Sequence, residues 1–219
     1  MHELHQQQGS LSATRREYTF GVLDEQAMAR DPFVQFGAWL EEAIAAGAPE
    51  PHAMTLATAT AEGVPSARIV LLKEFDTRGF VFFTNYESRK GGELAQNARA
   101  ALVFLWHALE RQVRVEGLVE MVATAEADAY FAQRPRRSQF AAIASPQSQV
   151  VPDRAALEQR YRAVEQHYAN QPAVRPAQWG GYRVLPRVIE FWQGRRDRLH
   201  DRIIYRNEDD TWHIERRAP

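Results

Sequence analysis

Apolar residues recur at helical spacing in two long stretches of the chain. The first follows Asp31 and Pro32, which supply a helix N-cap and a proline at the first helical position, and Gly47 is a natural stop. Its apolar stripe consists of Phe33, Phe36, Leu40 and Ile44. The second stretch, residues 152–169, has a stripe of Leu157, Tyr161, Val164 and Tyr168. Shorter helices are predicted for residues 88–97 and for a segment capped by Thr124 that ends near Arg134.

Other stretches alternate apolar and polar residues with the period of a β-strand. Val113 and Val115, for example, alternate with Gln112 and Arg114, so one face of that strand is polar. The predicted strands are residues 54–59, 67–75, 80–84, 100–106, 112–122, 181–185, 188–193, 199–205 and 211–215. They come in runs instead of alternating strictly with helices. This order predicts a mainly β, α+β fold: an antiparallel β-barrel with surrounding helices, and not a doubly wound parallel sheet.

Composition narrows the class of protein. With 219 residues, 45% hydrophobic and 25% charged, the chain is typical of globular domains. Residues 1–14 are polar and predicted to be disordered, and residues 15–219 are predicted to form one domain. The net charge of −1 gives no overall attraction to nucleic acid or membranes, so anion binding must come from local clusters. We therefore expect no nucleic-acid or membrane partner.

Cysteine and histidine usage excludes several kinds of chemistry. The chain has no cysteine, which rules out disulfides and thiolate metal sites, and its seven histidines lack metal-ligand spacing, so no metal is expected. No apolar run has the length of a signal peptide or a membrane span. We predict a cytoplasmic protein.

The segment from Glu190 to Arg202 carries the densest candidate chemistry. On a strand, Arg198, His200 and Arg202 occupy every second position and point to one face. Two permanent cations flanking an imidazole are costly on a core face unless anions meet them. An anionic ligand with chemistry beside it explains the pattern; a solvated edge strand is the alternative.

Further cationic clusters lie earlier in the chain. Arg68 and Lys73 bracket an apolar strand, but their odd separation puts them on opposite faces unless the strand is twisted or bulged. Ser88 is a predicted N-cap that places Arg89 and Lys90 in a first helical turn, where an anion would relieve their conflict with the helix dipole.

A phenol, a guanidinium and a hydroxyl come together in the segment Tyr130 to Gln139. Tyr130 and Arg134 share one helix face, and Ser138 follows the intervening proline, a set that suits a phosphate monoester. The hydroxyls and amides of Ser145 to Gln149 are also suited to donate to phosphate. For each cluster a solvated surface or an ordinary loop is the structural alternative.

Seven pieces of sequence, in this order, resemble the pyridoxine/pyridoxamine 5′-phosphate oxidase family. They are Arg15-Arg-Glu-Tyr18, Arg68-Ile-Val-Leu-Leu-Lys73, Ser88-Arg-Lys90, Trp106-His-x-Leu-Glu-Arg-Gln-Val113, Arg134-Pro-Arg-x-Ser-Gln139, Phe191-Trp-Gln-Gly194 and Arg198-Leu-His-Asp-Arg202. The resemblance implies an FMN-binding split barrel that forms a homodimer with FMN at the subunit interface. It further implies oxidation of pyridoxamine or pyridoxine 5′-phosphate to pyridoxal 5′-phosphate, with O2 as acceptor and H2O2 as by-product.

The resemblance also implies residue roles. The FMN phosphate would be held by Arg68, Arg89 and Lys90, together with Gln147 and Ser148 of the partner subunit. The rest of the flavin site would be lined by Ile69, Val70, Leu71, Leu72, Lys73, Phe83, Thr84, Gln112, Trp192 and Arg202. The substrate phosphate would be held by Lys73, Tyr130, Arg134 and Ser138. Arg198 and His200 would act at the reacting end of the pyridine ring, and Arg15 and Tyr18 would belong to a closing N-terminal segment.

Two other functions remain open at this point. A flavin reductase of the same fold should lack the substrate-phosphate residues and the pair Arg198 and His200. A non-catalytic carrier of a vitamin B6 phosphate would not need an intact FMN site. The residues also leave open whether His200 transfers a proton or only orients the substrate. The charged turn Arg195-Arg196-Asp197 and the extra cation Arg137 depart from the family pattern.

Overall fold

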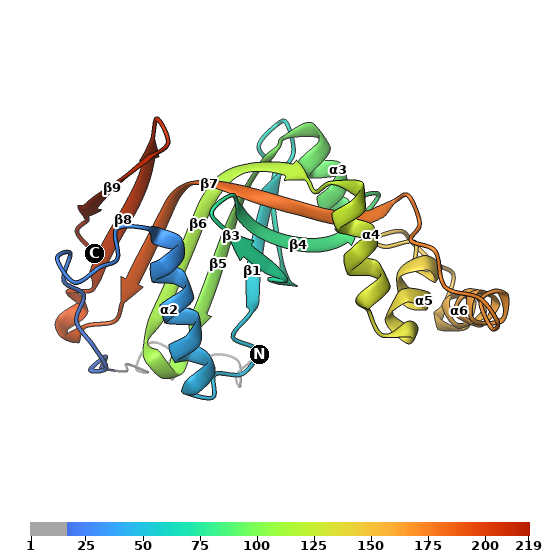
Figure 1. The fold of residues 1–219 in the computed structure, drawn as a ribbon, viewed down its shortest axis with the longest axis horizontal. Helices are drawn as coiled ribbons and strands as arrows, with labels where there is room; N and C mark the ends of the chain where they lie inside the picture. Colours follow the sequence, from blue (N-terminus) through green and yellow to red (C-terminus); the bar gives the residue numbers. More distant parts are fainter. Residues whose placement is uncertain (1–16) are drawn as a thin grey trace, which may run out of the picture.

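The computed structural model describes residues 17–219; the predicted disordered tail, residues 1–14, and Arg15 lie outside them. Within this part, a nine-stranded antiparallel sheet curls into a half-barrel (Figure 1) in the order β2-β1-β5-β6-β7-β4-β3, with β8 pairing β7 and β9 pairing β8. The strands are β1 Ala53–Ala59, β2 Pro65–Leu71, β3 Glu74–Asp76, β4 Gly79–Asn85, β5 Arg99–Trp106, β6 Arg111–Met121, β7 Trp179–Gln193, β8 Asp201–Glu208 and β9 Thr211–Arg216. The predicted antiparallel barrel is confirmed.

Helices surround this sheet as predicted, although no helix was predicted for residues 136–144. They are α2 Pro32–Ala45, α3 Arg89–Gln96, α4 Thr124–Gln133, α5 Arg136–Ala144 and α6 Arg154–His167, with short 3-10 turns η1 His107–Leu109 and η2 Arg196–Arg198. Figure 1 shows α2 beside the barrel and α4, α5 and α6 gathered at the end opposite β8 and β9. None of the helices in residues 17–219 is long and apolar enough to cross a membrane.

Local signals place α2 against the core. The Asp31 side chain accepts a hydrogen bond from the backbone N–H of Phe33, and Gly47 follows the helix with φ +68°. Phe36 is fully buried, and its ring packs edge-on against Phe80 at 4.9 Å and beside Phe104 at 5.0 Å. The helix therefore covers one side of the barrel core, while the polar face of β6 points outward.

Two strand predictions were wrong in detail. Residues 67–75 do not form one strand, because β2 pairs with β1 whereas β3 pairs with β4. The chain changes partner at Leu72 and Lys73, whose N–H groups donate to His52 O and Val81 O. Conversely, residues 179–193 form one long strand with a register shift where Gly117 faces Pro186. Pro186 has no backbone N–H to donate, and it is tolerated at this position because the register shift removes the need for a hydrogen bond there.

The predicted strand at residues 199–205 begins later than expected. β8 begins at Asp201, and Asp197 and Arg198 have φ of +55° and +60°, which breaks the extended backbone before it. Arg198, His200 and Arg202 therefore do not share one strand face. The N-cap of α4 is also Ala123, with no side-chain hydrogen bond, and not Thr124.

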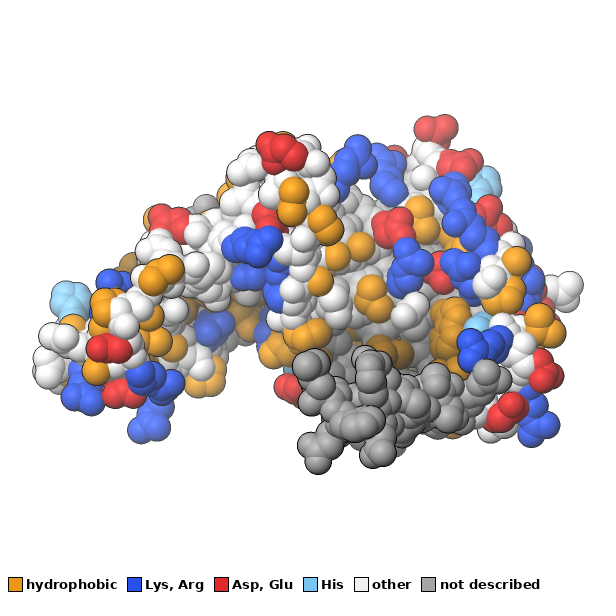
Figure 2. All heavy atoms as spheres, turned by 180° about the vertical axis from the view of Figure 1, so that it is seen from behind, with side chains coloured by type: hydrophobic (Ala, Val, Ile, Leu, Met, Phe, Trp, Pro, Cys, Tyr) orange, Lys and Arg blue, Asp and Glu red, His pale blue; other side chains and the backbone are white. Residues whose placement is uncertain are grey.

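Charges are intermixed on the surface. Figure 2, which views the face opposite to that of Figure 1, shows Lys and Arg side chains interspersed with Asp and Glu and no continuous basic area on that side. No group of three or more His, Cys, Asp or Glu within residues 17–219 is arranged to hold a metal ion.

Candidate active site

A cavity of about 470 Å³ brings most of the predicted cationic clusters together. β2, β4, α3, the α4–α5 segment and the loop after α5 contribute to it. Its walls are Arg68, Ile69, Val70, Leu71, Lys73, Phe83, Thr84, Lys90, Tyr130, Arg134, Pro135, Ser138 and Gln147. Arg68 and Lys73 both line it despite their odd separation, because the chain leaves β2 between them.

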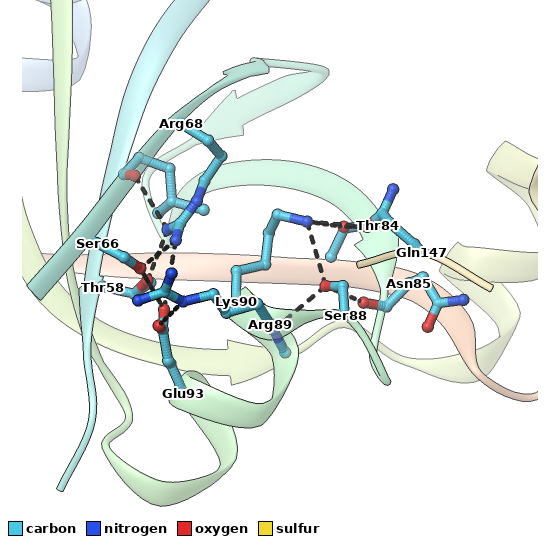
Figure 3. A network of polar contacts seen from close by, with 12 residues as sticks. Thr58, Ser66, Arg68, Thr84, Asn85, Ser88, Arg89, Lys90, Glu93 and Gln147 are labelled. Carbon is cyan, nitrogen blue, oxygen red and sulfur yellow. Dashed lines mark hydrogen bonds and ion pairs between the residues drawn. The ribbon is translucent and has the colours of Figure 1, made fainter. Parts of the chain in front are cut away.

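Arg68 is held at one end of this cavity by four protein groups (Figure 3). Its Nη1 donates to Leu56 O at 3.1 Å and to Thr58 Oγ1 at 2.6 Å. Its Nη2 donates to Ser66 Oγ and lies 3.3 Å from Glu93 Oε2. The guanidinium is thus oriented before any ligand binds, which lowers the entropic cost of binding an anion.

Glu93 is a buried carboxylate within this cluster, only 4% exposed. Burial raises its pKa, but hydrogen bonds from Ser66, Thr58 and Arg89 and the charge of Arg68 outweigh burial and hold the pKa at about 2. Glu93 therefore stays ionised and links Arg68 to Arg89, whose Nε lies 2.9 Å from Glu93 Oε1.

Lys90 is a buried cation at the centre of the site, 9% exposed. Its Nζ donates to Thr84 Oγ1 at 3.0 Å, Ser88 Oγ at 3.1 Å and Gln147 Oε1 at 2.8 Å. Burial and then the charge of Arg68 lower its pKa from 10.5 to about 8, although Glu93 opposes the shift. The ammonium forms no ion pair with residues 17–219, so an anionic ligand is the natural partner of this charge.

A second group of donors lies in the same cavity. Tyr130 stacks on Phe83 with ring centroids 3.8 Å apart, and the guanidinium of Arg134 lies 4.7 Å from the ring centroid of Trp179. Arg134 Nη2 donates to Ser138 O at 3.1 Å, whereas its Nε is buried and has no hydrogen-bond partner among the described residues. A buried unpaired guanidinium N–H is costly unless a ligand accepts from it.

The remaining predicted residues gather at the other end of β7. Gln112 of β6 pairs with Trp192 of β7, and Trp192 pairs with Arg202 of β8, so the three residues lie side by side on neighbouring strands. Arg202 forms a two-point contact with the buried carboxylate of Glu190, at 3.0 Å and 2.9 Å. The ring of His200 lies 4.7 Å from that of Trp192 and 5.5 Å from that of Tyr18.

These two groups cannot meet within one subunit. Thr84, in the cavity, pairs with Gly180 near the beginning of β7, whereas Trp192 lies near its end. At about 3.3 Å per residue, the strand between Gly180 and Trp192 is on the order of 40 Å long. Figure 1 likewise shows η2 and β8 far from α3 and α4.

Several predicted residues lie apart from the cavity wall. Leu72 is buried in the core, Ser148 is exposed beside Gln147, and the Arg89 side chain is 63% exposed and turned toward Glu93. Gln147 was expected to serve the site of the partner subunit; here its Oε1 accepts from Lys90 Nζ of its own chain, and the role across the interface stays a prediction.

Some residues that shape the site were not predicted from the sequence. Glu93 follows Arg89 by four residues on a helix, and Ser66 precedes Arg68 by two on a strand, so both had a local signal. Gly194 belongs to the motif Phe191-Trp-Gln-Gly194 but was given no role: a Cβ there would lie 2.7 Å from Tyr18 Cγ, so Tyr18 packs directly on this glycine.

Comparison with known proteins identifies the relatives of the chain. Residues 40–168 match the family described as pyridoxamine 5′-phosphate oxidase, and residues 179–219 match the pyridoxine 5′-phosphate oxidase C-terminal dimerisation region. The pyridoxine/pyridoxamine 5′-phosphate oxidase of Acaryochloris marina is 57% identical and covers 97% of both chains. That of Cupriavidus pinatubonensis is 57% identical over 95% of this chain and 99% of its own.

Solved structures show the same fold. PhzG from Burkholderia lata, determined with tetrahydrophenazine-1-carboxylic acid, is 31% identical with a TM-score of 0.84, over 90% of this chain and 98% of its own. A pyridoxamine 5′-phosphate oxidase-related, FMN binding protein from Nostoc punctiforme matches at a TM-score of 0.68 and 16% identity, over 91% of this chain and 100% of its own, and it supports the fold alone. From the family match and the close relatives together, the chain belongs to the pyridoxine/pyridoxamine 5′-phosphate oxidase family.

Proposed function

We propose that this protein is an FMN-dependent oxidase that converts pyridoxamine 5′-phosphate and pyridoxine 5′-phosphate to pyridoxal 5′-phosphate. O2 is the acceptor and H2O2 the by-product, and ammonia is released from the amine substrate. The observation that carries the proposal is one cavity with two separate groups of phosphate donors, around Lys90 and around Arg134. FMN and the substrate each carry one phosphate, so two groups are needed.

The donors around Lys90 fit the FMN phosphate. Arg68 is already oriented by neighbouring groups, Lys90 is buried without an ionic partner among residues 17–219, and Thr84 adds a hydroxyl. Ile69, Val70 and Leu71 would cover the isoalloxazine ring, and the exposed apolar side chain of Ile69, 65% exposed, suits that contact. Bound FMN supplies the hydride acceptor of the reaction.

The donors around Arg134 fit the substrate phosphate. The Arg134 Nε has no hydrogen-bond partner in the described part of the chain, and Lys73 lines the same cavity. The pKa of Lys73 is lowered by burial and by the charge of Arg134, which is the kind of cation crowding that a dianion relieves. Burial also raises the pKa of Tyr130, so its phenol remains protonated and donates. Ser138 completes the set.

The protein would work as a homodimer in which each site uses both subunits. Support comes from the match of residues 179–219 to a dimerisation region and from the separation between the cavity and the residues at the other end of β7. In this arrangement Gln112, Trp192, Arg198, His200 and Arg202 of one subunit complete the cavity of the other. Pairing also covers the polar outer face of the sheet.

The residues at the reacting end then have defined roles. Arg198 cannot serve as a base at neutral pH, because a guanidinium does not deprotonate. It would position the substrate ring and stabilise charge, while His200 contacts the same ring. Tyr18, packed against His200 and Trp192, would close the site together with Arg15. A location in the cytoplasm stays a prediction.

One spectroscopic experiment tests this function. The purified protein should show a flavin spectrum that bleaches when pyridoxamine 5′-phosphate is added without oxygen and returns in air. A flavin that ignores the substrate would support a reductase. If no flavin binds even after FMN is added, a vitamin B6 carrier becomes the better interpretation.

A further inference from the structure

The turn between β7 and β8 closes back on His200. The backbone N–H of Arg195 donates to Nδ1 of His200 at 3.1 Å. Asp197 and Arg198, with φ of +55° and +60°, bend the chain so that the ring returns to the beginning of the turn. Residues other than glycine adopt this conformation at a cost, so the turn is held in place by its other contacts.

The Nδ1 atom must therefore be an acceptor. A backbone N–H can only donate, so Nδ1 of His200 carries no proton while this bond exists. The proton of the neutral ring is then on Nε2. Adding a second proton at Nδ1 would break the bond and leave two N–H groups facing each other.

The surroundings of the ring favour the same neutral form. Burial, followed by the charge of Arg198, lowers the pKa of His200, and the negative charge of Asp201 opposes this only partly. The rings of Tyr18 and Trp192 pack against it and limit its rotation. His200 is thus a neutral ring of fixed orientation at ordinary pH.

The carboxylate of the next residue, Asp201, is engaged with other groups. Asp201 Oδ2 accepts from Arg195 Nη1 at 3.1 Å and from Leu23 N at 3.0 Å, and Oδ1 accepts from Arg216 Nη1 at 2.6 Å. A histidine that acts as a base usually donates from one nitrogen to a carboxylate and uses the other as the base. In this turn the direction of that hydrogen bond is reversed, because the backbone N–H of Arg195 donates to Nδ1 of His200.

We propose that the 194–200 turn locks His200 as the Nε2-protonated tautomer, so that it donates a hydrogen bond to the bound substrate and does not remove a substrate proton. This inference rests on the proposed function for the identity of the substrate, but the tautomer does not depend on it. The charged turn Arg195-Arg196-Asp197, which departs from the family pattern, gains a role as the segment that supplies the locking N–H.

The tautomer is measured directly in the FMN-loaded protein. Histidine labelled with 15N, observed by long-range 1H–15N NMR near pH 7.5, should show for His200 a protonated Nε2 and an unprotonated Nδ1. The signals of His200 are assigned by their loss in His200→Gln. A protonated Nδ1 would overturn the proposal whether or not the protein turns over pyridoxamine 5′-phosphate.

A pair of variants tests the donor role. The amide nitrogen of His200→Gln reaches the position of Nε2 and can donate, whereas His200→Asn reaches only the position of Nδ1. We expect His200→Gln to keep kcat/KM within a few-fold and His200→Asn to lose about tenfold or more, the size of one hydrogen bond to a ligand. Equal losses of about 10²-fold or more in kcat/KM in both variants, together with loss of the acidic limb of the pH–rate profile, would show that His200 acts as a base. That result would contradict the proposal. A wild-type flavin that never bleaches would instead refute the proposed function.

Discussion

If Lys90 binds the FMN phosphate as proposed, FMN affinity should depend on pH over a range that the burial of Lys90 sets. The pKa of the Lys90 ammonium in the unliganded protein is about 8, against an ordinary value of 10.5. Only the protonated form attracts a phosphate, so affinity should be highest below pH 8 and fall as pH rises through this value. With a pKa of about 8, the protonated fraction drops about tenfold between pH 7 and pH 9, and the FMN dissociation constant should rise by about the same factor.

The same burial has a consequence for stability. The difference between 10.5 and about 8 corresponds to about 3 kcal/mol that the charged lysine costs the folded, unliganded protein. Because the folded pKa lies below the unfolded one, this destabilisation is complete below pH 8 and disappears as pH rises toward 10.5. Lys90→Met should therefore weaken FMN binding without lowering the free energy of unfolding of the FMN-free protein at pH 7.

Flavin fluorescence quenching on titration of FMN-free protein, at constant ionic strength and at pH 7, 8 and 9, measures this dependence. The FMN phosphate, with its second pKa near 6, stays a dianion over this range. Two controls isolate Lys90: riboflavin, which lacks the phosphate, and Lys90→Met should both bind with little change between pH 7 and pH 9. A dissociation constant of wild-type protein that stays constant, or an equal rise in Lys90→Met, would refute the assignment.

Two further predictions concern the other half of the site. Arg198→Ala should lower kcat/KM for pyridoxamine 5′-phosphate far more than FMN affinity, because the residue is assigned to the substrate; equal losses of bound flavin and activity would contradict that role. Gly194→Ala places a Cβ 2.7 Å from Tyr18 Cγ and should displace this ring, raising KM while leaving the flavin content unchanged. An unaltered KM would show that Tyr18 does not help to close the site.

Local chemistry explains which parts of the fold were predictable. Asp31 caps α2 through its side chain, Pro32 and Gly47 favour the backbone conformations at its two ends, and Ser88 caps α3 by accepting from Gly91 N–H. The alternation around Val113 and Val115 likewise reports burial directly. Such signals act over a few residues, so they survive in the sequence without knowledge of the rest of the chain.

The wrong predictions came from contacts that are distant in sequence. The break between β2 and β3 lies where the N–H of Leu72 donates to His52 O, whereas the next N–H, that of Lys73, donates to Val81 O of β4. The alternation of Arg198, His200 and Arg202 looks like a strand, but a pattern of side chains carries no record of a positive φ at Arg198. The proposed site residues came from family motifs and stay a prediction, whereas their division between the two ends of β7 required the structure.

Mixing two nearly inactive variants is the best test of whether each site is shared between two subunits. Lys90→Met damages the cavity, and Arg198→Ala damages the completing half. If subunits are dissociated and reassembled in equal amounts, half of the dimers are mixed, and each mixed dimer has one site in which both halves are intact. The account predicts about a quarter of the wild-type activity from two nearly inactive parents. Activity no greater than that of the parents, in a mixture shown to contain mixed dimers, would contradict a shared site.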